Sequence, residues 1–331
     1  MPKFAVITGF LGRTKDRFHD YGEARDIGQK LRTLAAIEGY SGAEVVYPYE
    51  ISDAAILKGL FAETGLKPAA INVNVKAEPE FRSGGLTSAD AGVRHKAVSF
   101  IKQAKDFAIA VGADKVTCCP LGDGYEFAFQ YDYSEAWKRL VDCFGEAAAY
   151  KPELSLFIEY KPSETRGRCF VDSAAKTVCL IGATGQKGLG VTLDFGHSVY
   201  GGFTPAEDAS LVLDSGLPLY VHINDNDGKW DWDYFCGTKH YLEYVEFLAY
   251  LYRAGYEDWF TSDSSPTRWE VAPFFAANAR LTSRIWELLS RGGEAELRKR
   301  IGAADYMTTW RWIEDEVLGF GRQPADAPKP S

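Results

Sequence analysis

The sequence predicts an α/β protein, a (β/α)8 TIM barrel with a helical extension at its C-terminal end. Two observations predict this fold. Short apolar runs alternate with longer amphipathic stretches along most of the chain, which is the pattern of repeated βα units. In addition, four of the apolar runs between residues 154 and 263 end in side chains that commonly bind metals. In a barrel of parallel strands, such ends lie together on the face where active sites are built.

Length and composition fit a single barrel followed by a short arm. The chain has 331 residues, of which 46% are hydrophobic and 25% are charged, as in soluble globular proteins. Barrels of this class span roughly 200 to 400 residues, and no linker divides the sequence before residue 290. We therefore predict a catalytic domain over residues 1–290, and a helical arm with a disordered, Pro-rich tail over residues 291–331.

Charge and hydrophobicity argue against several kinds of partner. The net charge is −9 and no basic run is present, so nucleic acid is not expected as a partner. No apolar run reaches the roughly 20 residues needed to cross a membrane, and the first apolar run is interrupted too soon for a signal peptide. The six cysteines lack metal or paired spacing and are interpreted as buried free thiols. We expect a cytoplasmic protein.

The first half of the chain predicts four βα units. The predicted strands cover residues 4–9, 43–49, 69–75 and 115–119, and the predicted helices cover residues 22–39, 54–64, 87–111 and 134–150. Asp53 offers an N-cap to the second helix, while Gly65 and Gly112 end the second and third helices. Pro48 marks the end of the second strand, because proline cannot donate to a sheet.

A long loop follows the fourth predicted strand. It spans residues 120–137 and carries four aromatic rings between Tyr125 and Tyr131. Long loops on the catalytic face of a barrel usually serve function. We expect this loop to form a wall of the substrate site, and a packed Ω-loop is the alternative.

The second half of the chain carries the candidate metal ligands. The runs LSLFIEYKP, GVTLDFGH, LYVHINDN and DWFTSDSSP contain Glu159, Asp194, His222 and Asp263, at intervals of 35, 28 and 41 residues. Each interval accommodates one helix and one strand, and we expect helices near 171–183, 205–215, 238–254 and 271–290. Clustered buried carboxylates indicate a divalent cation, Mn²⁺ or Mg²⁺, with Co²⁺ or Zn²⁺ as alternatives. A salt-bridge cluster with nearby lysine and arginine is the other interpretation.

These motifs resemble those of the xylose isomerase-like superfamily of sugar isomerases and epimerases. IEYKP, LDFGH, VHINDN and SDSSP occur in this order, and the resemblance covers residues 4–290. It implies that Glu159, Asp194, His222 and Asp263 ligate a divalent metal. It also implies a small-molecule sugar substrate.

Two further patterns bear on the reaction. Glu159 and Lys161 form an E-x-K pair similar to that of xylose and rhamnose isomerases, where the lysine stabilises charge on a substrate oxygen. The resemblance also implies that His197, Asp231 and Asp233 hold a second, catalytic metal. Alternatively, Asp231 and Asp233 belong to an aromatic lid, and His197 contacts a substrate hydroxyl or is structural.

Two positions depart from the families that the chain resembles. Ketose 3-epimerases use glutamate as the first and the last ligand, whereas the last ligand here is Asp263, which is one methylene shorter. The loop after the second strand also lacks the histidine that xylose isomerase uses for ring opening, and Glu50 is a candidate substitute. These departures argue against a true xylose isomerase and weaken a symmetric two-base mechanism.

Other side chains are candidates for binding substrate. Arg166, Arg168 and Arg268 lie in loops after the fifth and eighth predicted strands, where they bind a phosphate or carboxylate or form surface salt bridges. Trp230 and Trp232 flank the acidic residue of the loop after the seventh strand. Both tryptophans are candidates to contact the sugar.

We predict a metal-dependent sugar isomerase or epimerase. Proton transfer next to a carbonyl, or a metal-mediated hydride shift, is the expected chemistry. Glu159 is the candidate acid/base, Asp263 a further catalytic candidate, and Lys161 and His197 the groups that steady developing charge. One alternative is the metal-bearing subunit of a C-glycoside deglycosidase, which eliminates a 3-oxo-sugar from an aromatic aglycone. Another is a non-catalytic sugar-binding barrel.

The C-terminal arm predicts contacts outside the barrel. Residues 291–323 have helical spacing with two tryptophans, Trp310 and Trp312, which a barrel core does not need. We expect the arm to pack on a neighbouring subunit or to cap the barrel. The first arrangement implies a homo-oligomer, or a hetero-oligomer with a small subunit if the protein is a deglycosidase.

Overall fold

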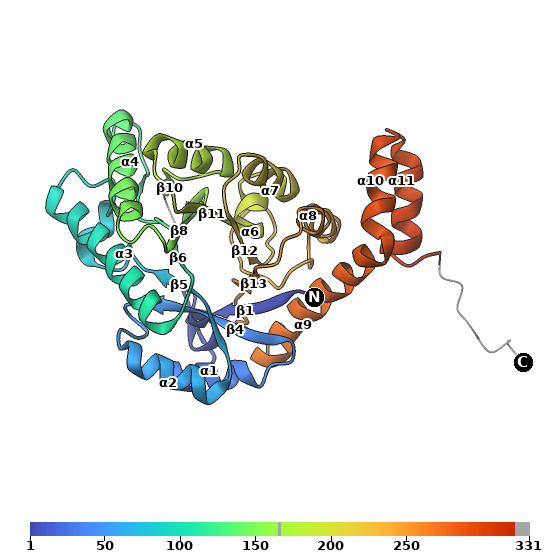
Figure 1. Cartoon of the computed structure of the whole chain (residues 1–331), viewed down its shortest axis with the longest axis horizontal. Helices are drawn as coiled ribbons and strands as arrows, with labels where there is room; N and C mark the ends of the chain where they lie inside the picture. Colours follow the sequence, from blue (N-terminus) through green and yellow to red (C-terminus); the bar gives the residue numbers. More distant parts are fainter. Residues whose placement is uncertain (165–166, 322–331) are drawn as a thin grey trace, which may run out of the picture.

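The computed structural model describes residues 1–164 and 167–321, and these residues form a barrel with a projecting arm (Figure 1). Eight parallel strands close the barrel in the order β1-β13-β12-β11-β8-β6-β5-β4. Their bounds are β1 Lys3–Ile7, β4 Tyr40–Tyr47, β5 Lys67–Val73, β6 Lys115–Cys118, β8 Ser155–Glu159, β11 Leu189–Asp194, β12 Leu219–Ile223 and β13 Trp259–Ser262. The predicted (β/α)8 barrel is confirmed. The predicted disordered tail lies outside the described residues.

The helices surround the strands, as Figure 1 shows. Their bounds are α1 Ile27–Ala35, α2 Ala54–Thr64, α3 Ala91–Val111, α4 Tyr133–Ala149, α5 Ala174–Thr184, α6 Phe195–Tyr200, α7 Pro205–Asp214, α8 Tyr241–Arg253 and α9 Val271–Leu288. Asp53 caps α2, and Gly65 ends it with a positive φ of 74°. The helices α1 and α3 begin later than predicted, because Asp26 and Asp90 cap them. The short helix α6 was not predicted.

The barrel interior is filled in layers, as expected for a closed barrel. Near one end, Ala70, Phe157 and Tyr220 pack with Trp259 into a small apolar cluster inside the strands. A Cβ on Gly190 would approach the Phe157 ring to 2.6 Å, so a glycine is needed beside that ring. The large outer core lies between strands and helices and excludes water from both. This rigid frame positions the polar residues at the carboxyl ends of the strands.

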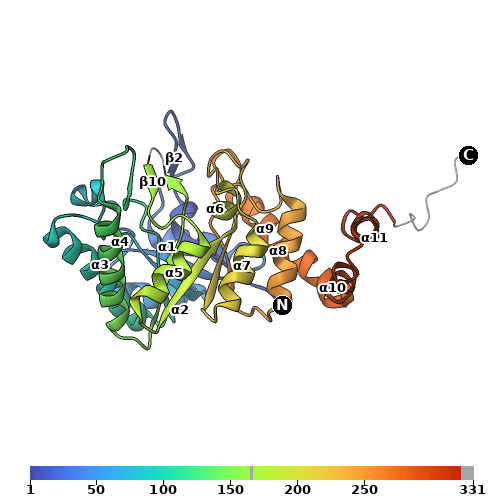
Figure 2. The same ribbon diagram turned by 90° about the horizontal axis from the view of Figure 1, so that it is seen from above.

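Short sheets build up the mouth of the barrel. A three-stranded sheet consists of β7 Gly124–Tyr125, β10 Gly167–Cys169 and β9 Ser163–Glu164, and a hairpin of β2 Thr14–Lys15 and β3 Asp20–Tyr21 lies in the loop after β1. Figure 2 shows β2 and β10 projecting at the same side of the barrel. The predicted long loop therefore contains strand β7. Its Tyr125 packs on Phe170 at 5.4 Å, while Phe127 and Phe129 are exposed.

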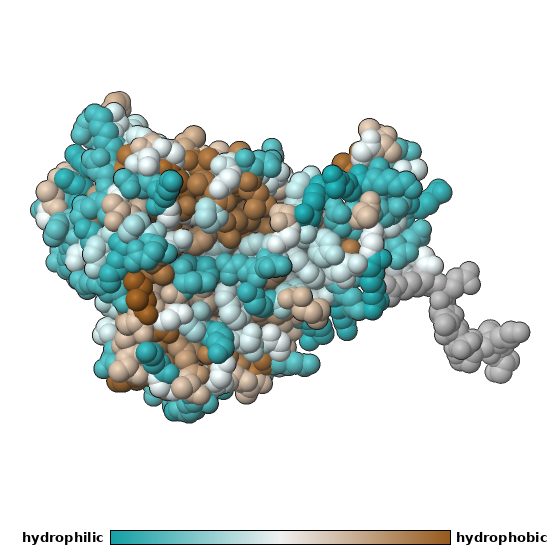
Figure 3. All heavy atoms as spheres, viewed as in Figure 1, coloured by the Kyte–Doolittle hydropathy of each residue, from teal (hydrophilic) through white to brown (hydrophobic). Residues whose placement is uncertain are grey.

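The arm stands apart from the barrel at the far end of α9 (Figure 1). It comprises η3 Leu289–Gly293, α10 Glu294–Gly302, α11 Tyr306–Trp312 and η4 Ile313–Val317. Within these helices α10 has no buried residue and α11 buries only Thr309. On the face in Figure 3 the surface of the arm is mainly hydrophilic, with apolar residues scattered across it. The division at residue 290 stays a prediction.

The structure also bears on the cysteines and on whether any helix could span a membrane. Five of the six cysteines are buried free thiols, and Cys179 is an exposed one, so the expectation of buried thiols holds for five positions. Among the described residues, none of the helices is both long enough and apolar enough to span a bilayer.

Candidate metal centre

Four predicted ligands converge at the mouth of the barrel. Glu159 ends β8, Asp194 ends β11, His222 lies in β12 and Asp263 follows β13 directly. Each offers a ligand atom, and these atoms lie within 4.8 Å of one another. The four strands are neighbours in the barrel, and Asp194 is the register partner of His222. The residues are therefore brought together by strand order and not by loop folding.

The cluster has the burial and the donor set that suit a divalent cation. Glu159, Asp194 and His222 are almost completely buried, and the Asp263 side chain is 15% exposed. His222 Nδ1 is buried and has no hydrogen-bond partner among the described residues, and it lies 3.4 Å from Asp263 Oδ2 and 3.6 Å from Glu159 Oε1. Such an orphaned nitrogen facing carboxylate oxygens fits a bound cation of the hard-to-borderline class.

The electrostatics of the cluster reflect crowded acids. Burial raises the pKa of Asp194 to about 7; the positive charge of His197 opposes this rise, and repulsion from Asp263 adds to it. Burial would also raise the pKa of Glu159, but attraction to the two histidines outweighs burial and lowers it to about 2. Glu159 is therefore held as a carboxylate, and Asp194 is the acid whose charge a cation would most relieve.

An amide pair that sequence reasoning missed fixes Asp194. Its Oδ2 accepts from Asn224 Nδ2 at 3.0 Å, and its Oδ1 accepts from the backbone N–H of His197 at 2.8 Å, which caps α6. Asn224 and Asn226 also hold the backbone of Gly196, where a Cβ would approach Asn224 Oδ1 to 2.4 Å. Both asparagines stand in the VHINDN motif, so their position beside His222 was the available signal.

Sequence reasoning also missed a buried carboxylate outside the cluster, Glu44. Glu44 lies on β4, on the far side of His222, and accepts from His222 Nε2 at 3.1 Å. The available signal was a single glutamate within the otherwise apolar run AEVVY. A fully buried carboxylate needs donors on both oxygens. Its presence in a predicted strand therefore indicated a polar barrel interior.

Lys161 and His197 converge on Asp231. Lys161 Nζ lies 2.8 Å from Asp231 Oδ2 and also pairs with Glu164, and His197 Nε2 lies 3.2 Å from the same Asp231 oxygen. The other ring nitrogen of His197, Nδ1, faces the carbonyl oxygen of Tyr160 at 2.9 Å. Both ring nitrogens thus face acceptors. Burial lowers the pKa of His197, but Asp194 and Asp231 raise it to about 9.

The predicted second metal set is only partly assembled. Asp233 lies near Asp231, and burial together with repulsion from Asp231 raises the pKa of Asp233 well above its ordinary value. Within the described residues, His197, Asp231 and Asp233 do not meet the spacing that groups the first four ligands. The ammonium of Lys161 pairs with Asp231. A second metal stays a prediction.

The remaining candidates lie around the rim. Trp230 contacts the Tyr200 ring at 6.0 Å, Trp232 is 48% exposed, and Arg268 is exposed over the Tyr21 ring. Arg168 lines a pocket of about 350 Å³ together with other residues of the mouth. Arg166 lies outside the described residues. Their proposed contacts with substrate stay predictions.

Glu50, the candidate substitute for a ring-opening histidine, is engaged elsewhere. Its two carboxylate oxygens contact Lys30 and Thr8, and its side chain is 15% exposed. These contacts hold the loop after β4 against α1. A catalytic role for Glu50 therefore requires that it exchange a buried lysine for substrate, so it stays an unsupported prediction.

Fold and site together define a class of protein. A closed barrel of eight parallel strands, with three carboxylates and an imidazole meeting at the carboxyl ends of adjacent strands, is the arrangement of cation-assisted barrel enzymes. Residues 31–276 match the family of xylose isomerase-like TIM barrels, and the chain belongs to this family. The predicted resemblance is thereby confirmed.

Individual relatives include sugar isomerases and epimerases. The chain is 24% identical over 239 residues to a xylose isomerase of Thermus thermophilus, covering 70% of this chain and 62% of the relative. In structure it is similar to D-allulose 3-epimerase from Methylomonas sp. in complex with D-allulose, with a TM-score of 0.64, 16% identity and coverage of 88% and 96%. It is also similar to 3-keto-D-glucoside 4-epimerase from E. coli, with a TM-score of 0.61, 16% identity and coverage of 83% and 98%.

Proposed function

We propose that this protein is a divalent-metal-dependent isomerase or epimerase of a monosaccharide or close derivative. The observation that carries the proposal is the buried Nδ1 of His222, which has no hydrogen-bond partner in the described part of the chain and faces Glu159 and Asp263 within a cluster of four candidate ligand atoms. Mn²⁺ and Mg²⁺ fit this oxygen-rich donor set best. When bound, the cation polarises a substrate carbonyl and acidifies the adjacent C–H.

The two ends of the ligand set supply the proton transfers. Glu159 and Asp263 stand on β8 and just after β13, with β11 and β12 between them, so their carboxylates approach substrate from two directions. Glu159 is the proposed base, because it ends β8 at the mouth of the barrel and its carboxylate lies within reach of the cation site beside His197. Asp263 is the more exposed of the two and is the proposed partner for the return of the proton.

Lys161 and His197 provide the positive potential beside this pair. Burial lowers the pKa of Lys161, but Asp231 and Glu164 outweigh it and raise the pKa well above the ordinary value, so the ammonium persists at neutral pH. His197 lies 3.3 Å from Glu159 Oε1 through its Nδ1. Fixed cations of this kind stabilise negative charge that develops on a substrate oxygen.

The experiment that tests the proposal combines metal analysis with proton exchange. Protein purified under anaerobic conditions is analysed for bound metal and then incubated in D₂O with a panel of ketoses, aldoses and 3-oxo-glycosides, free and phosphorylated. We expect one equivalent of metal and deuterium incorporation beside the carbonyl of at least one sugar. Full metal loading without exchange in any sugar would exclude proton-transfer chemistry. Two equivalents of metal per chain would support the predicted second metal site.

One observation favours a second candidate function. Exposed Phe127 and Phe129 stand on the loop after β6, which also lines the 350 Å³ pocket, and a structural neighbour acts on a 3-keto-D-glucoside. The same acidified C–H serves elimination of an aromatic aglycone from a 3-oxo-glycoside. Release of free aglycone in the panel above, with no isomerised sugar, would identify this lyase reaction.

A further inference from the structure

Glu44 is a fully buried carboxylate inside the barrel and is not one of the four candidate ligands. Its two oxygens accept from four different side chains. Oε1 accepts from Asn72 Nδ2 and Thr117 Oγ1, both at 2.8 Å. Oε2 accepts from Tyr220 Oη at 2.9 Å and from His222 Nε2 at 3.1 Å. These donors come from β5, β6 and β12, so the strands around the barrel hold Glu44 in place.

The hydrogen bond that His222 donates to Glu44 determines which ring nitrogen of His222 faces the cluster. An ionised carboxylate can only accept hydrogen bonds, so its fourth partner, His222, must be a donor. His222 Nε2 therefore carries a proton. Its other nitrogen, Nδ1, then points at Asp263 Oδ2 and Glu159 Oε1, at 3.4 and 3.6 Å. Histidines that bind metals through one nitrogen are commonly fixed through the other in this way.

We propose that Glu44 is a positioning residue that orients His222 toward the cation by accepting its Nε2–H. The inference rests on the cation site of the proposed function and not on the sugar reaction. Tyr220 extends the network, because its hydroxyl also contacts Thr261 Oγ1 at 2.5 Å on β13. Glu44 thus connects β4, opposite the site, with the two strands that carry His222 and lead to Asp263.

The first test compares cation affinities in the absence of substrate. Metal-stripped wild type and the variant Glu44→Gln are titrated with Mn²⁺ by calorimetry, with free Mn²⁺ followed by electron paramagnetic resonance. A glutamine cannot accept from all four donors, so we expect affinity to fall by about 10- to 100-fold. Asp208→Asn is the matched control, because Asp208 is a buried carboxylate that accepts from Tyr160 and Ser198 on the outer side of the barrel. It should stay within about threefold of wild type.

A second measurement needs no variant and covers the case in which Glu44→Gln fails to fold. Wild type labelled with ¹⁵N-histidine is loaded with ¹¹³Cd²⁺. We expect one histidine to show coupling between cadmium and Nδ1 and to retain a slowly exchanging Nε2–H, with His222→Gln removing that signal. Coupling through Nε2 would overturn the proposal.

The outcomes separate this inference from the proposed function. A purely structural role for Glu44 predicts a lower melting temperature with unchanged Mn²⁺ affinity, and that result would overturn the inference alone. Failure of wild type to bind Mn²⁺, Mg²⁺, Co²⁺ or Zn²⁺ would instead remove the metal centre and the proposed function. Lower Mn²⁺ affinity in Glu44→Gln, with the control unchanged, supports the positioning role of Glu44. This result does not depend on which sugar is the substrate.

Discussion

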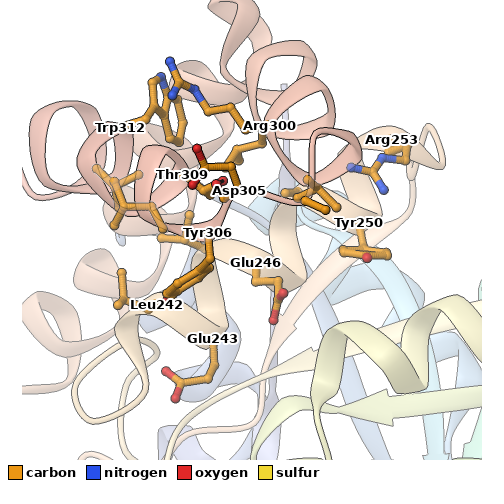
Figure 4. A pocket seen from close by; sticks show the side chains of 17 residues that line it. Leu242, Glu243, Glu246, Tyr250, Arg253, Arg300, Asp305, Tyr306, Thr309 and Trp312 are labelled. Carbon is orange, nitrogen blue, oxygen red and sulfur yellow. Dashed lines mark hydrogen bonds between the residues drawn. The ribbon is translucent and has the colours of Figure 1, made fainter.

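The candidate metal centre and the C-terminal arm differ in how strongly the rest of the molecule fixes their side chains. Three of the four candidate ligands are buried, and Asp194 is held by Asn224, which directly follows the neighbouring strand β12. On the arm, Tyr306 and Met307 are 66% and 69% exposed. A cavity of about 570 Å³ separates the arm from α8, and Figure 4 shows Tyr306, Asp305 and Trp312 on the arm around it. The barrel strands therefore fix the side chains of the candidate centre, whereas much of the arm's surface is not covered by the barrel.

Loss of a ligand should have the largest effect. The variant His222→Gln removes the buried nitrogen that faces two carboxylates, so we expect Mn²⁺ affinity to fall by more than about 100-fold, beyond the range for supporting residues. Calorimetry on metal-stripped protein measures this loss, with circular dichroism as the check on folding. Near-normal affinity in a folded variant would mean that the cluster is not the cation site.

Removal of the buried ammonium should affect turnover more than cation binding. In Lys161→Met, Asp231 loses the ammonium and keeps its contact with His197, and the positive potential at the substrate oxygen is reduced. We expect kcat to fall by about 100-fold, as for loss of one electrostatic stabiliser, with Mn²⁺ affinity within a few-fold of wild type. The comparison uses the sugar identified by deuterium exchange. Unchanged kcat would confine Lys161 to a structural pairing with Asp231.

A change of pH should have a smaller effect on cation affinity than the loss of His222. Asp194 has a pKa of about 7 in the metal-free protein, so below this pH a proton occupies the oxygen that the cation requires. Affinity should therefore rise with pH through about 7, by up to about tenfold per unit below it. Calorimetry in two buffers with different ionisation enthalpies measures the released protons. A flat affinity between pH 6 and 8 would contradict a protonated Asp194.

Changes in the arm should have the smallest effect on the centre. The double variant Tyr306→Ser and Met307→Ser alters exposed side chains, and such changes usually shift stability by less than about 0.5 kcal/mol in a monomer. If the arm packs on a second copy, we expect smaller assemblies by light scattering with cation affinity unchanged. A drop in cation affinity would show that the arm and the candidate centre are coupled, which would contradict the expected independence of the two regions.

The predicted strands and the four ligands illustrate how much local pattern determines. Glu159, Asp194, His222 and Asp263 each stand at or next to the carboxyl end of an apolar run, and parallel strand order brings such ends together. Helix α6 escaped prediction because it has only six residues and follows β11 directly, with Asp194 as its N-cap. The arm was placed by its helical spacing, but spacing does not indicate what covers it.

By itself, the sequence determined the barrel, the order of its strands and the four residues at the site, because hydrophobic periodicity and residue spacing are local properties. The tertiary structure alone decided the partners of those residues. Glu44 is 178 residues from His222, and Asn224 is 30 residues from Asp194, yet both pairs are hydrogen-bonded. Lys161, in the loop after β8, likewise meets Asp231, in the loop after β12. Such contacts depend on barrel closure and register, which no single stretch of sequence encodes.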